Sequence, residues 1–377
     1  MRFLTCGATV AAALMFAVAA PAARADSDRV LCIGARADFD GEIAACTRLI
    51  ELGQRSDNNL AVAYYDRGNA FQGKGDFDHA IADYTQAIAL DPKFAPAYNN
   101  RGNGYAATDD YDRAIADFDQ AIALEPKDAR AYDSRAAAYD AKGDHDHAVA
   151  DYNQAIALNP KNPDAYVRRG VAYEARGDLN HAVFDFYRAL AFDPRNAGAY
   201  NNRGNVFRRQ GDFDSAIADY TEAIALDPKL VIAYSNRGVV YGDKGEYDAA
   251  IADASRAIAL DANFAHAYSH RGDAYDAKGE FDQAVADASQ ALTLDPKLAS
   301  AFTTRAAAYF GKGDLDNAIA DYTEAIALDP KSAAALYGRG VAEIKKGDSS
   351  VGESDVSAAL TIQANIADAM AKLRVSP

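Results

Sequence analysis

The sequence predicts an all-α protein, built as a solenoid of antiparallel helix pairs. Prolines and alanines recur along the chain at intervals of 34 residues. Within each interval the apolar residues follow helical spacing, and a glycine followed by an acidic residue divides most intervals into two helices. A single helix pair is too thin to bury its own apolar face, so stacked copies are needed to form the core.

The composition is that of a folded protein and excludes several classes of function. The chain has 377 residues, of which half are hydrophobic and a quarter are charged. Its 55 acidic and 39 basic side chains give a net charge of −16, which disfavours nucleic acid and anionic lipid as partners. Three cysteines and six histidines leave little material for zinc clusters or iron–sulfur centres.

Residues 1–25 have the pattern of a secretory signal peptide. An arginine follows Met1, an apolar run occupies residues 8–20, and small residues precede Asp26. The alternative is a membrane anchor, but the run is short and Pro21 interrupts it. We expect cleavage after Ala25 and a periplasmic or secreted protein with a charge of −18, since the removed segment holds two arginines and no acid. No later segment predicts a transmembrane helix.

Cleavage would leave two cysteines, Cys32 and Cys46. In an oxidising compartment, such a pair is most simply a disulfide that closes a short loop. A redox role is the alternative, and the absence of a Cys-x-x-Cys motif argues against it.

The first complete interval shows how each helix pair arises. In residues 61–74, aromatic side chains and a glycine lie three or four residues apart and form one stripe of a helix. Gly75 then breaks that helix and Asp76 caps the next one. A second stripe occupies residues 77–90, and Pro92 prevents its continuation.

This unit resembles the tetratricopeptide repeat. The positions typical of that repeat are filled in the first unit by Tyr64, Gly68, Phe71, Ala80, Tyr84, Ala87 and Pro92. The resemblance is to secreted bacterial members of the family. It implies a right-handed superhelical solenoid whose first helices line the concave face. It also implies a non-enzymatic scaffold that binds a protein or peptide segment there. Envelope assembly, secretion and polysaccharide export are processes that such proteins serve.

The repeat pattern divides the chain into four parts. After the signal peptide, residues 26–60 form an N-terminal helical cap that the disulfide would fasten. Residues 61–332 hold eight repeats, which start at positions 61, 95, 129, 163, 197, 231, 265 and 299. Residues 333–377 hold a degenerate ninth repeat and a C-terminal capping helix, with Ile366, Met370 and Leu373 on one face.

One departure from the family pattern recurs in every unit. The first helix carries arginine where leucine is usual, at positions 67, 101, 135, 169, 203, 237, 271, 305 and 339. The second helix always carries aspartate sixteen residues later, from Asp83 to Asp355. In an antiparallel hairpin these positions face each other, so we expect structural ion pairs such as Arg67–Asp83 and Arg203–Asp219. A row of arginines that binds acidic ligands is the alternative.

Asparagines gather on the first helices and are the predicted partner-binding residues. An amide both donates and accepts hydrogen bonds, as a peptide backbone does. These candidates are Asn69, Asn99, Asn100, Asn103, Asn201, Asn202, Asn205 and Asn236. Tyr65 and Phe310 are expected to add apolar contacts with the partner. The alternative is that asparagine is only a tolerated residue of an exposed helix.

His266 and His270 lie four residues apart on one first helix, a spacing that also suits metal ligands. We interpret them as groove residues that contact a partner. The alternative function is a soluble, acidic ion- or metal-binding periplasmic protein that uses this pair.

No catalytic motif is recognisable in the sequence. It contains no Gly-x-Ser-x-Gly, no phosphate-binding loop and no His-Glu-x-x-His. We therefore expect neither an enzymatic activity nor a bound cofactor. The expected partner is a protein or peptide, whose identity the sequence does not reveal.

Overall fold

The structure is a computed structural model that describes residues 28–32, 38–52, 57–372 and 374–375. Within these ranges every regular element is a helix, so the all-α prediction is confirmed. None of these helices has both the length and the apolar composition that crossing a bilayer requires. The predicted signal peptide, residues 1–25, lies outside the described residues.

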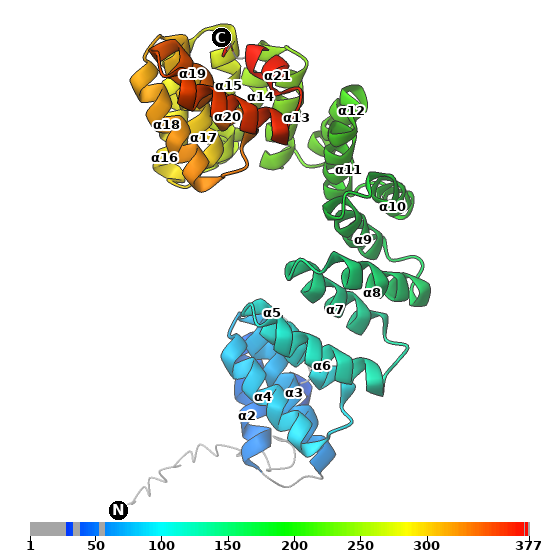
Figure 1. Cartoon of the computed structure of the whole chain (residues 1–377). Helices are drawn as coiled ribbons and strands as arrows, with labels where there is room; N and C mark the ends of the chain where they lie inside the picture. The colour runs from blue at the N-terminus through cyan, green and yellow to red at the C-terminus, as the bar shows by residue number, and fades with distance from the viewer. Residues whose placement is uncertain (1–27, 33–37, 53–56, 373, 376–377) are drawn as a thin grey trace, which may run out of the picture. The chain divides into compact units, whose positions relative to one another are not determined.

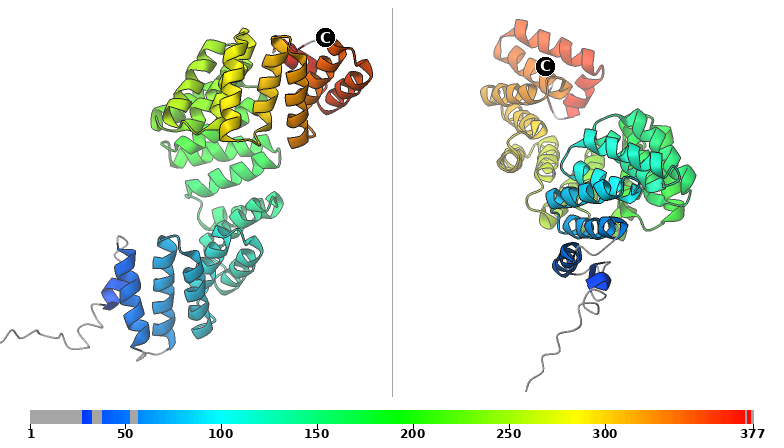
Figure 2. Two further views of the ribbon diagram at one scale, coloured as in Figure 1. Left: turned by 90° about the vertical axis from the view of Figure 1, so that its left-hand side faces the viewer. Right: turned by 90° about the horizontal axis from the view of Figure 1, so that it is seen from below.

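The helices fall into two compact units, divided after Pro160. In the first unit each helix packs against its neighbour in the chain, and Figure 2 shows these helices side by side in its left view. The described helices of this unit are α2 (Phe39–Glu51), α3 (Asp57–Gly73), α4 (Phe77–Leu90), α5 (Ala95–Ala107), α6 (Tyr111–Leu124), α7 (Ala129–Ala141) and α8 (His145–Leu158).

The second unit continues the same alternation and ends in a short extra helix. Its longer helices again form antiparallel pairs that stack on one another (Figure 1). They are α9 (Pro163–Ala175), α10 (Leu179–Phe192), α11 (Ala197–Gln210), α12 (Phe213–Leu226), α13 (Val231–Asp243), α14 (Tyr247–Leu260), α15 (Ala265–Lys278), α16 (Phe281–Leu294), α17 (Ala299–Gly311), α18 (Leu315–Leu328), α19 (Ala333–Lys346), α20 (Ser349–Ile362) and α21 (Ile366–Lys372).

The turn inside each pair follows from two adjacent residues. Gly75 has a φ of +78°, a left-handed conformation that costs glycine little, and it ends α3. Asp76 then accepts a hydrogen bond from the backbone N–H of His79 and caps α4. In the second pair Asp109 replaces the glycine and adopts a φ of +59°, a conformation that aspartate tolerates better than most residues.

Large rings packed on glycines join the two helices of a pair. A side-chain carbon on Gly68 would lie 2.7 Å from the ring of Tyr84, and one on Gly102 would lie 2.7 Å from Phe118. Both rings are fully buried. The glycine in the first helix and the aromatic residue in the second therefore depend on each other. A larger residue in place of the glycine would clash with the ring, and a smaller residue in place of the ring would leave a gap.

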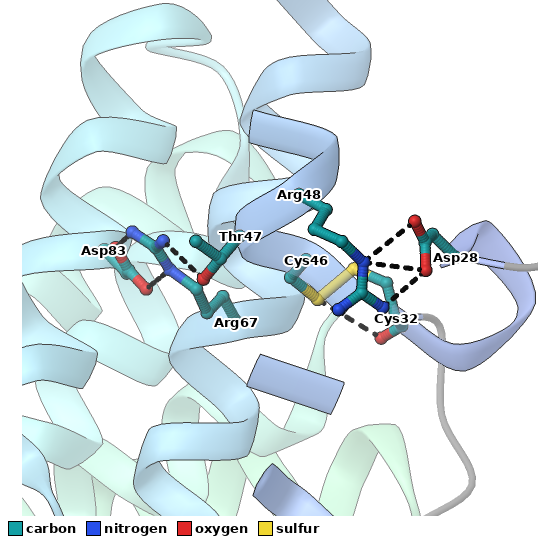
Figure 3. The surroundings of a disulfide bond; sticks show 7 residues. All are labelled: Asp28, Cys32, Cys46, Thr47, Arg48, Arg67 and Asp83. Atoms are coloured by element: carbon teal, nitrogen blue, oxygen red, sulfur yellow. Dashed lines mark hydrogen bonds and ion pairs between the residues drawn. A yellow bond between two sulfur atoms is a disulfide. The ribbon is translucent and has the colours of Figure 1, made fainter. Parts of the chain in front are cut away.

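At the N-terminal end, a disulfide joins Cys32 to Cys46 (Figure 3). Cys32 lies in a helical segment at residues 28–32, and Cys46 lies on α2. Arg48, two residues further along α2, donates to Asp28 at 3.1 Å, so a covalent bond and an ion pair hold the same two segments together. α3 begins at Asp57, four residues before the first repeat position.

Candidate functional site

The first helices of successive pairs contact one another within each unit and form a continuous face. These contacts join α3, α5 and α7 in the first unit, and α9, α11, α13, α15, α17 and α19 in the second. We call this surface the first-helix face. The predicted partner-binding residues all lie on these helices.

All nine arginines of the recurring position bind their aspartates in the same way. The Nε and Nη2 atoms of each guanidinium donate to the two carboxylate oxygens over 2.6–3.0 Å. The arginine side chains are 11–22% exposed and the aspartates 1–12% exposed. Each arginine is therefore occupied inside its own helix pair and is not presented as a row for acidic ligands.

The third arginine nitrogen links one repeat to the next, a feature that the sequence analysis missed. The Nη1 atom of Arg237 donates to the hydroxyl of Thr221 at 2.9 Å, and that of Arg271 donates to Ser255 at 3.0 Å. Arg203 has an aromatic neighbour there, since its guanidinium carbon lies 4.2 Å from the centre of the Tyr187 ring. One side chain thus contacts both helices of its pair and the second helix of the preceding pair.

The asparagines of the first unit form a network between neighbouring repeats. Asn100 on α5 donates to Asn69 at 2.8 Å and to the hydroxyl of Tyr65 at 3.1 Å, both on α3. Asn69 also accepts from the hydroxyl of Tyr84 at 2.9 Å. Asn99 donates to Asn100 over 3.4 Å. Asn103, one turn further along α5, is half-buried.

The second unit repeats this network in the same positions. Asn236 on α13 donates to Asn201 at 3.1 Å and to Asn205 at 3.0 Å, both on α11. Asn205 also accepts from Tyr220 at 2.8 Å, and Asn201 donates to Asn202 at 3.3 Å. A residue that binds a partner should be accessible, but Asn201 is only 6% exposed, and its side chain bonds to two other asparagines.

The two histidines differ in their surroundings. His266 is exposed and stacks on the ring of Phe264. The Nδ1 atom of His270 lies 2.9 Å from the hydroxyl of Ser235, within hydrogen-bond distance. Burial, with smaller contributions from the charges of His266 and Arg208, lowers the pKa of His270 to about 4. Within the described part of the chain, no three His, Cys, Asp or Glu side chains are grouped as metal ligands would be.

A pocket of about 510 Å³ opens on the first-helix face of the second unit, and sequence reasoning missed it. It is lined by residues of α13, α14, α15, α17, α19 and α21, among them His270, Asp273, Thr304 and Ala369. Thr304 donates to Asp273 at 2.6 Å. Burial raises the pKa of Asp273 to about 6, so this carboxylate is ionised at neutral pH in a poorly solvated place.

Asp276 lies one turn beyond Asp273 on α15 and is 1% exposed. Neither of its carboxylate oxygens has a hydrogen-bond partner in the structure. Burial raises the pKa of Asp276 to about 8, with a further contribution from Asp273, while Arg374 opposes the shift. The signal in the sequence was the two acids themselves, three residues apart on the inner stripe of a first helix.

Phe310, expected to contact a partner, is 6% exposed, because the C-terminal helix α21 packs in the same apolar cluster. Tyr65 is half-buried and lies against the ring of Phe94, with 4.9 Å between the ring centres. Thus Tyr65 keeps part of its surface on the first-helix face, whereas Phe310 does not.

Stacked helix pairs that present polar side chains and a pocket on one face define a helical-repeat protein. The chain belongs to the tetratricopeptide repeat family. Models described as TPR repeat match residues 138–177, 204–245, 272–313 and 308–347. Models described as tetratricopeptide repeat match residues 61–94, 95–128, 163–196, 186–218 and 231–264.

Solved structures of such proteins are similar to this chain in fold. A tetratricopeptide repeat protein from Parabacteroides merdae is 21% identical over 65% of this chain and 97% of its own, with a TM-score of 0.55. The Cut9–Hcn1 complex of the APC/C is 16% identical over 93% of this chain and 86% of its own, with a TM-score of 0.56. YrrB, described as a TPR protein with an unusual peptide-binding site, is 23% identical over 49% of this chain and 95% of its own, with a TM-score of 0.41. No curated protein sequence matches the chain.

Proposed function

We propose that this protein is a non-enzymatic scaffold of the periplasm or the extracellular space that binds a segment of a partner protein on its first-helix face. Tetratricopeptide repeat proteins bind protein or peptide partners, which is the basis for the class of ligand. The disulfide between Cys32 and Cys46 supports an oxidising compartment. The processes that fit this reading are envelope assembly, secretion and polysaccharide export.

The observation that carries the proposal is the set of amides held in place on the first-helix face of both units. An amide has two donor hydrogens and two acceptor lone pairs, and a fixed amide loses little entropy when it binds an extended backbone. Asn202 is half-buried and is oriented by the bond that it accepts from Asn201. Asn103 is also half-buried, in the first unit.

Two substitutions test the proposal with little disturbance of the fold. Asn103→Asp and Asn202→Asp remove donors and add charge on the first-helix face, and an aspartate at 202 keeps the acceptor that Asn201 uses. The matched control is Gln290→Glu, the same chemical change on an exposed position of the second helix α16. Each protein is crosslinked to its surroundings in the native envelope and purified.

A partner captured by the parent and the control, but lost from the double variant, is the expected result. Equal capture by all three proteins would contradict binding on the first-helix face. Retention of all three in the cytosol would contradict the proposed compartment.

A further inference from the structure

The C-terminal helix α21 packs against first helices of the second unit. Its apolar residues Ile366 and Met370 are 3% and 1% exposed, and Val375 beyond it is fully buried. They share one cluster with residues of the first helices α17 and α19, namely Ala306, Ala307, Phe310, Leu336, Tyr337, Val341 and Ala342. Ala369, the residue before Met370 on α21, lines the pocket that also holds Asp273.

The turn after α21 directs a basic side chain to the end of α15. Arg374 adopts a φ of +58°, which is unfavourable for a residue with a side chain, and its N–H bonds to the carbonyl of Ala371. Its guanidinium lies over Gly279, where an added side-chain carbon would be 3.1 Å from Nη1. The strained backbone at Arg374 therefore places its positive charge at the end of α15.

Asp276, near the end of α15, is a buried group that could pair with such a charge. The carboxyl group of Asp276 has no hydrogen-bond partner, and the hydroxyl of Tyr322 has none either. Burial raises the pKa of Tyr322, and Asp276 raises it further. Burial keeps the Asp276 carboxyl largely protonated at neutral pH, and an arginine that donated to it would stabilise its ionised form. The charge of Arg374 acts on Asp276, but Arg374 stays exposed. Both carboxyl oxygens of Asp276 can therefore still accept hydrogen bonds from another arginine.

We propose that the first-helix face of α15, α17 and α19 is a docking site for a short amphipathic helix followed by an arginine, and that the chain's own C-terminal segment occupies it until a partner displaces it. The spacing of the segment defines the ligand: two large apolar residues four apart, as Ile366 and Met370 are, and an arginine four residues further on. The inference rests on the proposed function, because it names the kind of segment that binds.

Displacement is feasible because α21 is short. A helix of seven residues with two buried apolar side chains binds weakly by itself. Because α21 is connected to the rest of the chain, its binding is intramolecular, and the high effective concentration keeps the site occupied. A partner helix with more apolar contacts and an arginine within reach of Asp276 competes successfully.

The test uses the full chain and a fluorescent peptide with the sequence of residues 364–377. Met370→Glu in the chain loosens its own α21, and the peptide should then bind at least about tenfold more tightly than to the parent. The same peptide carrying Arg374→Ala should bind about tenfold less tightly to that variant. Equal binding to the parent and to the Met370→Glu chain would overturn the proposal.

A second variant keeps the test valid if Met370→Glu disturbs folding. Arg374 is exposed, so Arg374→Ala in the chain leaves the core intact, and the peptide should again bind more tightly than to the parent. No change in peptide affinity would contradict the role of the arginine. A dimer that the free peptide dissolves would also overturn the proposal, because the segment would then belong to a second copy.

The outcome separates this inference from the proposed function. A partner that is captured through Asn103 and Asn202 but does not compete with the peptide would leave the scaffold function standing and exclude this docking site. A partner that the peptide displaces would support both.

Discussion

Arg203 on α11 donates two hydrogen bonds of 2.7 Å to the carboxylate of Asp219 on α12, and the same guanidinium lies over the ring of Tyr187 in the preceding pair. One side chain thus connects three helices. The same bidentate pair recurs in every repeat, so the register between the helices of a pair is defined by charge as well as by packing.

Arg203→Leu should destabilise the second unit by about 3–5 kcal/mol, because it leaves Asp219 buried without its partner. The double variant with Asp219→Leu should recover most of this loss, since no charge is then stranded. Denaturant unfolding of the parent, both single variants and the double variant measures the coupling. The surface control is Arg195→Leu, at an exposed position, which should change stability little. Unchanged or increased stability of Arg203→Leu would contradict the account of Asp219 as a buried charge that depends on Arg203.

Asn236→Asp should destabilise the contact between α11 and α13 by about 1–3 kcal/mol. The aspartate has nearly the same shape, but it loses both N–H donors and places a negative charge against the oxygens of Asn201 and Asn205. Hydrogen exchange of α11 and α13 should accelerate before that of α17. If exchange in α11 is unchanged, the amide network does not connect these repeats.

The mature protein should contain no free thiol. The disulfide consumes Cys32 and Cys46, and cleavage after Ala25 removes Cys6. Thiol titration under denaturing conditions, together with the intact mass, measures both events at once. One free thiol and a mass that includes residues 1–25 would contradict the predicted cleavage. Two or more free thiols would contradict the disulfide.

Asp276 contributes stability that should be lost as the pH rises from about 4 to about 8. The unfolded carboxyl loses its proton near its ordinary value of 3.8, while burial and Asp273 keep the folded one protonated up to a pKa of about 8, against the charge of Arg374. The unfolded state therefore binds fewer protons across this window, and ionisation there favours unfolding. Asp276→Asn should stabilise the protein at pH 8 by about 1–3 kcal/mol and much less at pH 4. An equal effect at both pH values would contradict a titrating carboxyl at this position.

Much of the architecture follows from local patterns that the sequence displays directly. Gly75 and Asp76 define a turn, Tyr84 needs the space above Gly68, and Arg67 and Asp83 are equally distant from that turn. Each of these relations lies within one helix pair, so a single unit of the sequence contains all the information. The exact repetition of the pattern then extends the prediction along the array.

The relations that the sequence did not reveal cross from one repeat to another. Asn100 reaches Asn69, 31 residues earlier, only because α5 stacks on α3 with a particular offset. The burial of Asn201 has the same origin, since its neighbour Asn236 is 35 residues away. The docking of Met370 beside Phe310 depends on where the end of the chain folds back. These contacts depend on how one repeat stacks on the next and on where the chain folds back, and the pattern inside a single repeat does not specify either.

Site-specific photo-crosslinking tests most directly whether the first-helix face binds the partner. A photoreactive amino acid is placed at position 202 on α11 or at position 290 on α16, and the cells are irradiated before the envelope is extracted. The account predicts a crosslinked partner from position 202 and none from position 290. A partner crosslinked only from position 290, or equally from both positions, would contradict it.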